Sequence, residues 1–572
     1  MFAVRSVAAL IAIGVLITAC APTRPTGTGS AGISAAVPRE ASQPTRALSM
    51  VMRVEPRSVM DSYTDRSAVH KALFTSTLGS WNLQAEPFPV LAEALPKLGT
   101  DTWRVLPDGR METVYRLRPG LTWHDGTPLT AQDVAFSRRS ANARIDGGLD
   151  STDAESMAME EVVAQDARTV LIRWRQPYPE AAAPDLIIVA RHLLEPVLEA
   201  GDLDAFATSP YWTSEWVGAG PYRLDRWERG AHIDGVAFAG YALGAPKISR
   251  VRLTWNNDPN VSLARLMSGD ADVALDGSIR FEQASILRKQ WTPQNSGTTL
   301  LNPTSLRYLQ FQFRSAYTSP KALLDVRARR AMVHAIDRSA MADAMVEDMS
   351  MVADTVPPPT APYFAAVDKV TTKYPFDLRR TEQLLGELGY ARSADGVYTS
   401  PTEGRFQMEV RGVSGGDEER DTTIAANDLQ LAGFDPTIML LSSSARSVDE
   451  RTKGTFPGVT LNNNTLQRGL GLQKWLTINI AGPENNWVAV NRMGWSNPEY
   501  DRLYNQWTTS LDRAQWNDSL VQMMKLISEE LPSPALYYNF QVLAHTNEVR
   551  GPQALTPDST RYSNVREWEW TR

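Results

Sequence analysis

Short stretches in which apolar and polar positions alternate recur along the chain. In 48–54, for example, Ser49 and Arg53 stand between Leu48, Met50 and Val54. A period of two is typical of a half-buried strand. The same reasoning predicts further strands over 112–117, 170–174, 222–227, 251–255, 271–275, 307–313, 405–411 and 534–541.

Between these stretches, apolar residues recur three and four positions apart, which predicts helices. The longest is expected over 325–345, where Val326, Ala335 and Met341 share one face. Another begins after Thr130, the expected N-cap, with Asp133 at the third helical position. Further helices are predicted over 260–267, 378–388, 421–431, 499–511 and 518–530.

The order strand, helix, strand over 251–275 predicts a crossover between parallel strands, and therefore an α/β fold with a partly parallel sheet. The chain shows no internal repeat and no heptad pattern. More than 500 of its 572 residues follow residue 46. A single hydrophobic core stops growing near ~250–300 residues, so at least two lobes are expected.

The first twenty residues combine Arg5, an apolar run over 7–19 and small residues before Cys20. This pattern predicts a lipoprotein signal peptide over 1–20, with Cys20 as the lipidated residue. A plain signal peptide with an incidental cysteine is the alternative. Residues 21–46, rich in Pro, Thr, Ser, Gly and Ala, predict a flexible tether. Because Cys20 is the only cysteine, lipidation would leave no thiol for a disulfide or a metal.

Composition narrows the classes of partner. The net charge is −7 with both signs interspersed, so nucleic acid is not expected as a partner. After residue 46 no apolar stretch is long enough for a transmembrane helix. The six histidines are scattered, so no metal centre is expected, and no cofactor motif is present. A metal chelate remains an alternative ligand. The 16 tryptophans suit a cleft that stacks on ligands, although many are expected in the core.

One motif favours an enzyme. Gly412 to Gly416 reads GVSGG, which matches the nucleophile elbow of serine hydrolases, and it follows a predicted strand. The only histidine downstream is His545. A serine hydrolase or peptidase using Ser414 is therefore the alternative function, and a chain without enzymatic activity is the preferred one.

Six segments occur in an order that resembles a known family. They read YRLRPGLTWHDGTPLTAQDVAF at 115–136, GAGPYRL at 218–224, LMSGDADV at 266–273, DVRARRAMVHAIDR at 325–338, LLGELGY within 377–390, and NPEYDRL at 497–503. Together they resemble the family 5 solute-binding proteins of bacterial ABC importers, which include oligopeptide-, dipeptide- and nickel-binding members. The resemblance covers nearly the whole chain after the tether.

The resemblance implies a periplasmic-binding-protein type II fold with two α/β lobes and a ligand cleft between them. Lobe I would span 47–303 and lobe II 304–540, with 541–572 returning to lobe I. The crossings are expected near 302–308 and 538–545. It also implies a monomeric, lipid-anchored binding protein in the periplasm or on the outer face of the cytoplasmic membrane. Its partners would be a small-molecule ligand and the permease and ATPase of the importer.

Peptide binders of this family hold the ligand's amino terminus with an aspartate in lobe II. Here the corresponding stretch, 451–490, contains only one acid, Glu484, among several asparagines. A buried ammonium needs a carboxylate, so the departure favours a neutral, sugar-like, opine-like or otherwise modified solute over a simple peptide. The candidate ligand-binding residues are Trp81, Asn82, Trp255, Tyr308, Asn463, Glu484, Trp487 and Asn491. The alternatives are core packing for the tryptophans and a solvated loop for the asparagines.

Overall fold

The computed structural model describes residues 46–571, except 62–67, 147–153, 276, 350, 443–448, 467–468, 470 and 558. The predicted signal peptide, Cys20 and nearly all of the tether lie outside the described residues. Within them, no helix combines the length and the apolar character needed to cross a membrane.

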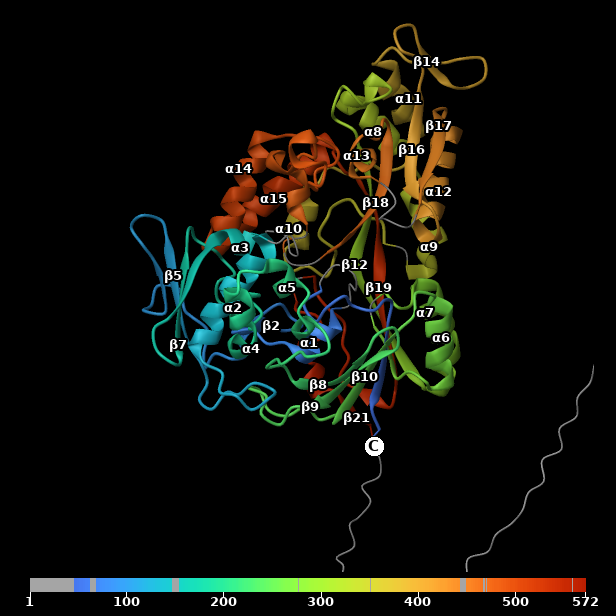
Figure 1. Cartoon of the computed structure of the whole chain (residues 1–572). Helices are drawn as coiled ribbons and strands as arrows, with labels where there is room; N and C mark the ends of the chain where they lie inside the picture. Colours follow the sequence, from blue (N-terminus) through green and yellow to red (C-terminus); the bar gives the residue numbers. More distant parts are fainter. Residues whose placement is uncertain are drawn as a thin grey trace, which may run out of the picture. The chain divides into compact units, whose positions relative to one another are not determined.

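A ten-stranded sheet runs through the described body (Figure 1). In spatial order its strands are β17 (Asp435–Leu441), β16 (Gln407–Val413), β18 (Val459–Thr465), β12 (Gly297–Phe311), β19 (Ala535–Thr546), β11 (Val273–Ala274), β1 (Leu48–Met52), β10 (Arg250–Trp255), β9 (His232–Ala237) and β8 (Tyr222–Glu228). Each contains or overlaps a predicted strand except β17, β18 and β9.

The predicted crossover is confirmed. Strands β10 and β11 both pair with β1 in parallel, and α6 (Pro259–Ser268) connects them. The Asp258 side chain accepts a hydrogen bond from the Asn260 amide and caps this helix. Gly269 ends it in the left-handed region, at φ 80°, which suits a residue without a Cβ.

Two long strands, β12 and β19, cross from one half of the body to the other. They pair antiparallel, with a shift of register between Asn302 and Ser305. On one side of this shift β19 pairs with β11, and on the other side β12 pairs with β18. Both predicted crossings fall in these strands, and we use lobe I and lobe II with the predicted boundaries as working names.

Each lobe contains its own hydrophobic clusters. Lobe I packs around β1, β5 (Met111–Arg116), β7 (Thr169–Trp174) and β10, with a smaller cluster beneath α6 and α7 (Phe281–Gln294). Lobe II has one cluster around β16 and α12 (Gly416–Ala432) and another around α14 (Pro498–Thr509) and α15 (Arg513–Glu530). Separate cores allow the lobes to move as units about the two crossing strands.

A second sheet of four strands covers one side of lobe I, in the order β4 (Trp103–Val105), β5 (Met111–Arg116), β7 (Thr169–Trp174) and β6 (Met159–Ala164). Helix α2 (Ala131–Asp146) packs on it. As predicted, Thr130 and Asp133 form its capping contacts, since the Thr130 amide donates to the Asp133 carboxylate at 2.8 Å. His124 lies before this helix, and its ring bonds to the backbone of Gly218 and Gly220.

One helix prediction was wrong. The stretch 325–345 forms two helices, α8 (Val326–Ala335) and α9 (Arg338–Val346). Ile336 between them is extended, and the Asp337 side chain accepts from the amides of Ser339 and Ala340. Apolar spacing continues across the break, but Asp337 is an N-cap that starts a second helix.

The remaining elements are shorter or lie at the periphery. The helices are α1 (Val69–Phe74), α3 (Ala154–Ala158), α4 (Arg191–Glu199), α5 (Leu203–Ala207), α10 (Phe364–Val370), α11 (Leu378–Gly386) and α13 (Glu450–Gly454). The strands are β2 (Gly79–Trp81), β3 (Pro87–Pro89), β13 (Ala391–Arg392), β14 (Tyr398–Ser400), β15 (Gly404–Arg405), β20 (Val549–Arg550) and β21 (Glu569–Trp570).

The large sheet has two distinct faces at the crossing strands. Tyr308 of β12 packs in the cluster of α14 and α15. The neighbouring Arg307 points the opposite way and bonds to Asp421 of α12. Ala544 of β19 packs in the cluster of α6 and α7. We call the side of Tyr308 the cavity face, and the side of Arg307 and Ala544, with α6, α7 and α12, the far face.

Candidate ligand-binding cavity

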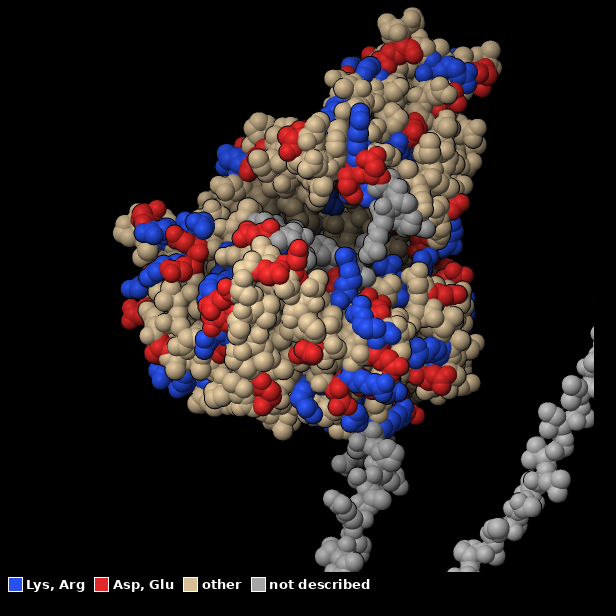
Figure 2. Space-filling model, in the orientation of Figure 1, with Lys and Arg blue, Asp and Glu red and all other residues tan. Residues whose placement is uncertain are grey.

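A cavity of about 840 Å³ lies between the two lobes. Figure 2 shows the hollow between the two masses of the described body. Its lining comes from lobe I, from lobe II, from Thr304 in β12 and from the C-terminal segment 555–566. This volume is within the usual range of ligand pockets, about 300–1,000 Å³, and a site between lobes is where solute-binding clefts are expected.

Lobe I contributes a polar wall with both signs of charge. The residues are Lys71, Thr75, Ser76, Thr77, Ser80, Phe88, Val90, Glu155, Met157, Tyr178, Glu180, Asp185, Ile187 and Tyr241, with five smaller apolar ones. Burial raises the pKa of Tyr241 to about 12, so its phenol stays protonated at neutral pH.

Two carboxylates of this wall, those of Glu155 and Glu180, converge on one tyrosine. The Tyr178 hydroxyl lies 3.4 Å from Oε2 of Glu155 and 3.3 Å from Oε2 of Glu180. The Asp185 amide donates to the same Glu155 oxygen at 3.1 Å. Tyr178 itself is buried and stacks on Trp174, with ring centroids 5.1 Å apart. The stacked pair fixes the position from which Glu155 and Glu180 face the cavity.

Lobe II contributes a neutral wall. Its described lining residues are Leu466, Gly469, Gln473, Leu476, Ile478, Asn479, Tyr504, Trp507, Thr508 and Trp516, and none of them is charged. Trp507 packs at 5.4 Å from Trp516 and at 5.7 Å from Tyr504. The Trp507 indole N–H is buried and has no hydrogen-bond partner among the described residues. This wall offers aromatic surface to the cavity.

The floor of the cavity is tied to the crossing strands. The Thr304 hydroxyl donates to Oε1 of Gln541 at 3.0 Å, and the Arg561 guanidinium donates to the same oxygen. The Leu555 amide donates to Oδ1 of Asn302 at 2.9 Å. The C-terminal segment is thereby bound to both strands at their shift of register, and it brings Arg561 and Arg566 into the lining.

None of the eight predicted site residues, all of which are described, lines this cavity. Asn82 holds a turn, since its Oδ1 accepts from the amides of Gln84 and Glu86. Asn491 is fully buried, donates to the carbonyls of Leu476 and Trp495, and accepts from the Gly494 amide. The side-chain amides of Asn82 and Asn491 therefore form hydrogen bonds within the fold.

The predicted aromatic contacts also lie outside the lining. Trp81 is part-buried, and its indole donates to the Ala183 carbonyl at 3.2 Å. Trp255 packs against the core of lobe I at the end of β10. Tyr308 is buried in the lobe II core, where it accepts a hydrogen bond from Lys474 at 3.3 Å. These positions agree with the alternative of core packing.

The other three candidates belong to the surface of lobe II. Asn463 lies in β18, directly opposite Arg307 of the neighbouring strand β12. Glu484 is exposed within the 3₁₀ helix Pro483–Asn485. Trp487 lies beside Arg314, whose guanidinium is 5.4 Å from the indole centroid. The structure therefore assembles Trp487 with Arg314 and Tyr317 rather than with the cavity.

Sequence reasoning missed Trp507, Trp516 and the carboxylates around Tyr178. A signal for Trp507 was present, because it follows NPEYDRL by a few residues on the same helix. For the carboxylates around Tyr178, the sequence contains no comparable signal. Glu155, Tyr178 and Asp185 come from separate segments that meet only in the folded lobe.

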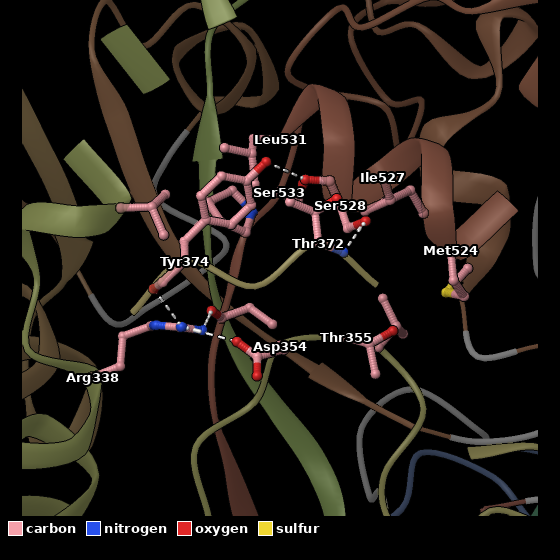
Figure 3. A pocket seen from close by; sticks show the side chains of 14 residues that line it. Arg338, Asp354, Thr355, Thr372, Tyr374, Met524, Ile527, Ser528, Leu531 and Ser533 are labelled. Atoms are coloured by element: carbon pink, nitrogen blue, oxygen red, sulfur yellow. Dashed lines mark hydrogen bonds and ion pairs between the residues drawn. The ribbon is translucent and has the colours of Figure 1, made fainter. Parts of the chain in front are cut away.

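A smaller cavity, of about 20 Å³, lies inside lobe II (Figure 3). The Arg338 guanidinium donates beside it to Asp354 at 2.9 Å and to the Tyr374 carbonyl at 2.8 Å. Its volume suffices for about one water molecule. This space is a packing feature and is too small for a solute.

The predicted hydrolase elbow has a structural role. The Gly415 amide donates to the Glu419 carboxylate, and Gly415 and Gly416 both have positive φ at the start of α12. Ser414 follows β16, whereas His545 lies on β19 where it pairs with Val273. Strands β18 and β12 stand between β16 and β19, so the fold does not bring these two residues together.

Metal ligands do not gather in the described residues. No group of three or more His, Cys, Asp or Glu side chains is arranged there for a metal ion. The described lining of the large cavity contains neither histidine nor cysteine.

The chain is similar to known binding proteins in sequence. The family model of bacterial extracellular solute-binding proteins, family 5, matches residues 93–466. Protein XP55 of Streptomyces lividans is 30% identical over 355 residues, which are 61% of this chain and 58% of that protein. The dipeptide-binding protein of Escherichia coli is 27% identical over 319 residues, 52% of this chain and 55% of that protein. The chain thus spans little more than half the length of these relatives.

Solved structures agree over a longer range. NikZ of Campylobacter jejuni, in complex with Ni(L-His), superposes with a TM-score of 0.73 at 19% identity, covering 92% of this chain and 100% of that one. The oligopeptide-binding protein of Thermus thermophilus, complexed with a pentapeptide, gives 0.72 at 22% identity, with 92% and 96% covered. The predicted type II periplasmic-binding fold is confirmed. Since the family model covers more than half of its residues, the chain belongs to the bacterial extracellular solute-binding proteins of family 5.

Proposed function

We propose that this protein captures a small, polar, peptide-like solute between its two lobes and delivers it to the permease of an ABC importer. The observation that carries the proposal is the cavity of about 840 Å³, which both lobes and the crossing strands line. A ligand held there contacts both lobes at once and is therefore able to stabilise their approach to each other.

The lining favours a solute that carries both an ammonium and an anionic group. Glu155, Glu180 and Asp185 supply carboxylates from lobe I. Lys71, Arg561 and Arg566 supply cations, and the described lining of lobe II is uncharged. The ammonium would lie toward lobe I, and an apolar or aromatic portion against Trp507 and Trp516. Similarity to the dipeptide-binding protein of Escherichia coli and to the glutathione-binding protein GsiB of Shigella dysenteriae supports a peptide-like solute.

We further propose that Cys20 is lipidated and that the residues after it tether the body to the outer face of the cytoplasmic membrane or to another membrane of the cell envelope. A monomer with a permease and an ATPase as partners fits this arrangement. The signal in 1–20 and membership of an extracellular family support it.

A thermal-shift screen tests the function. The panel contains di- to pentapeptides, glutathione, opines, sugars and the nickel–histidine chelate. Hits are then titrated by tryptophan fluorescence and calorimetry. The carboxylates of lobe I predict a shift of several degrees at saturation with peptides that carry a free amino terminus. The absence of any shift with such peptides would reject the ammonium site.

The screen also separates binding from catalysis. We expect a saturable signal with one class of solute and no product by mass spectrometry. Turnover of an ester or a peptide that disappears in Ser414→Ala would contradict the proposal. Saturable binding of sugars alone would retain the binding function and reject the ammonium site.

A further inference from the structure

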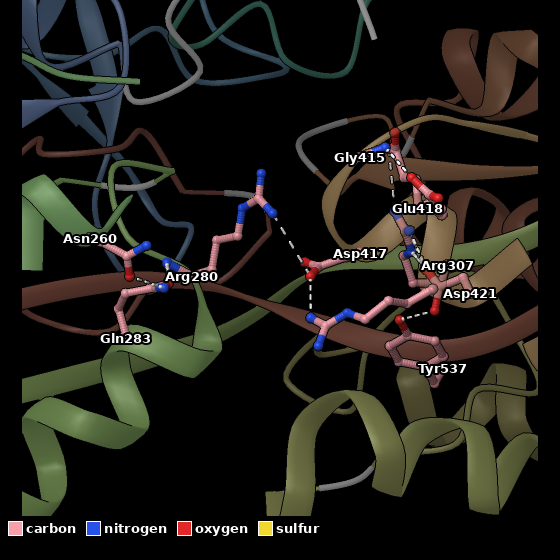
Figure 4. A network of polar contacts seen from close by, with 11 residues as sticks. Asn260, Arg280, Gln283, Arg307, Gly415, Asp417, Glu418, Asp421 and Tyr537 are labelled. Carbon is pink, nitrogen blue, oxygen red and sulfur yellow. Dashed lines mark hydrogen bonds and ion pairs between the residues drawn. The ribbon is translucent and has the colours of Figure 1, made fainter. Parts of the chain in front are cut away.

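A second set of contacts joins the lobes on the far face of the sheet, away from the cavity. It consists of Arg280 with Asp417, Phe281 with Phe540, and Ser285 with Glu347 (Figure 4 shows the first of these). Arg280, Phe281 and Ser285 lie at the start of α7 in lobe I. Asp417 and Glu347 belong to lobe II, and Phe540 to the strand β19 that enters it.

These contacts are specific. The Arg280 guanidinium lies 4.0 Å from Asp417, and a Cβ added to Gly416 would come within 2.3 Å of it. The Ser285 hydroxyl donates to Glu347 at 3.2 Å. Phe281 is 93% buried and stacks at 5.8 Å on Phe540, although its helix belongs to lobe I.

At the rims of the cavity, by contrast, side chains of the two lobes stay exposed. Met157 of lobe I and Ile478 of lobe II both line it, yet they are 59% and 85% exposed. The two rims therefore do not cover each other on the cavity face. In this structure the lobes meet on the far face. On the cavity face they meet where Leu511 of lobe II packs against the lobe I cluster, whereas the rims at Met157 and Ile478 stay exposed.

We infer that the far-face contacts hold the cleft open and thereby set the affinity of the protein for its solute. Strands β12 and β19 run between the two faces, so a rotation about them that brings the rims together separates Arg280 from Asp417. Ligand binding must then supply the free energy of breaking these contacts. The apparent dissociation constant rises as the fraction of molecules able to close falls.

The inter-lobe distance without ligand tests this directly. The full chain with Cys20→Ser has no other cysteine, so spin labels at Met157→Cys and Ile478→Cys report the separation of the rims. Arg280→Ala is expected to increase the population with short separations about two- to five-fold, as for loss of one exposed ion pair. Arg280→Glu, which repels Asp417, should increase the population with short separations further.

Arg252→Ala is the matched control. Arg252 is as exposed as Arg280, 49% against 51%, but its partner Asp234 lies in the same lobe. It should leave the distances unchanged. Raising the salt concentration from 50 to 500 mM should move the parent toward shorter distances and leave Arg280→Ala unaffected, because salt screens an exposed pair. Unchanged or longer distances in both Arg280 variants would overturn the inference.

The consequence for affinity rests on the proposed function and is measured separately. With a solute identified by the screen, Arg280→Ala should bind about two- to five-fold more tightly. Unaltered affinity together with shorter rim distances would reject the link to binding but retain the mechanical role of the contacts. An identified solute that binds without closing the rims would overturn both.

Discussion

Lys474 is a buried ammonium in the core of lobe II. Its Nζ lies 3.3 Å from the Tyr308 hydroxyl and 4.6 Å from the centroid of that ring. No carboxylate contacts it in the described part of the chain. Burial lowers the pKa of Lys474 from its ordinary value to about 7. The folded state therefore disfavours the charged form, which the unfolded state keeps up to about pH 10.

This difference makes stability depend on pH. Between about pH 7 and pH 10 the unfolded chain binds the proton and the folded chain does not, so the free energy of unfolding rises with pH. Lys474→Met should be more stable than the parent at pH 7. As the pH rises, the difference in the free energy of unfolding between the two proteins should shrink by at most about 1.4 kcal/mol per pH unit. Urea denaturation from pH 6 to pH 9 measures it. Lys525→Met, at an exposed lysine, should show no such trend.

Trp507 packs in the core of lobe II and also lines the cavity. Its indole N–H has no partner among the described residues, so Trp507→Phe breaks no hydrogen bond, but the smaller ring should lower the ligand-free stability by about 1–2 kcal/mol. It should weaken solute binding by about 3- to 10-fold through lost aromatic contact. Trp103→Phe is the control, since Trp103 is buried in lobe I, bonds to Met111 and does not line the cavity. Calorimetric titration of both variants with solute measures their affinities. An affinity of Trp507→Phe equal to that of the parent would contradict the proposed site.

At the scale of elements, a buried ion pair fixes α12 on the far face of the sheet. Arg307 of β12 donates to Asp421 of α12 at 2.6 Å, and the Tyr537 hydroxyl of β19 donates to the other carboxylate oxygen at 2.7 Å. All three side chains are almost fully buried. The pair connects one helix with both crossing strands.

Removing one partner leaves the other charge buried. Asp421→Leu or Arg307→Met should each lower the free energy of unfolding by about 3–5 kcal/mol, whereas the double variant should lose less than the sum. Arg405→Met removes an exposed arginine that pairs with Asp395 and Asp435 and should cost about 1 kcal/mol or less. Denaturant unfolding of the parent and these four variants is the measurement. A loss in the double variant equal to the sum of the two single losses would refute the coupling.

At the scale of the whole molecule, the two lobes are separate cores connected through β12, β19 and the segment 555–566. Ligand-driven closure is expected to cover the rims of the cavity. In the full chain with Cys20→Ser, a cysteine at Ile478 should react with maleimide at a rate that falls several-fold on saturation with solute. A cysteine at Leu431, which is 73% exposed on α12 and does not line the cavity, should react at an unchanged rate. Equal rates with and without solute at Ile478 would exclude closure over this rim.

Most of the elements, and the family, were predictable from local patterns in the sequence, although β9, β17 and β18 were not. Alternation along β1, β5 and β10, the cap at Thr130 and Asp133, and the crossover through α6 follow from local periodicity and turn chemistry, and the structure has them. The break between α8 and α9 was less evident, because the apolar face continues across it while Asp337 caps a new helix.

The position of the site depends on contacts between distant segments, which no local pattern predicts. Trp81, Asn82 and Asn491 have the right chemistry for a ligand, but their polar atoms bond to nearby backbone. The cavity takes its carboxylates from segments around Glu155 and Asp185 and its aromatic wall from α14 and α15. Hydrophobic periodicity reports which face of one element is buried. It carries no information about which elements meet across a cleft, because that depends on the packing of two cores about the crossing strands.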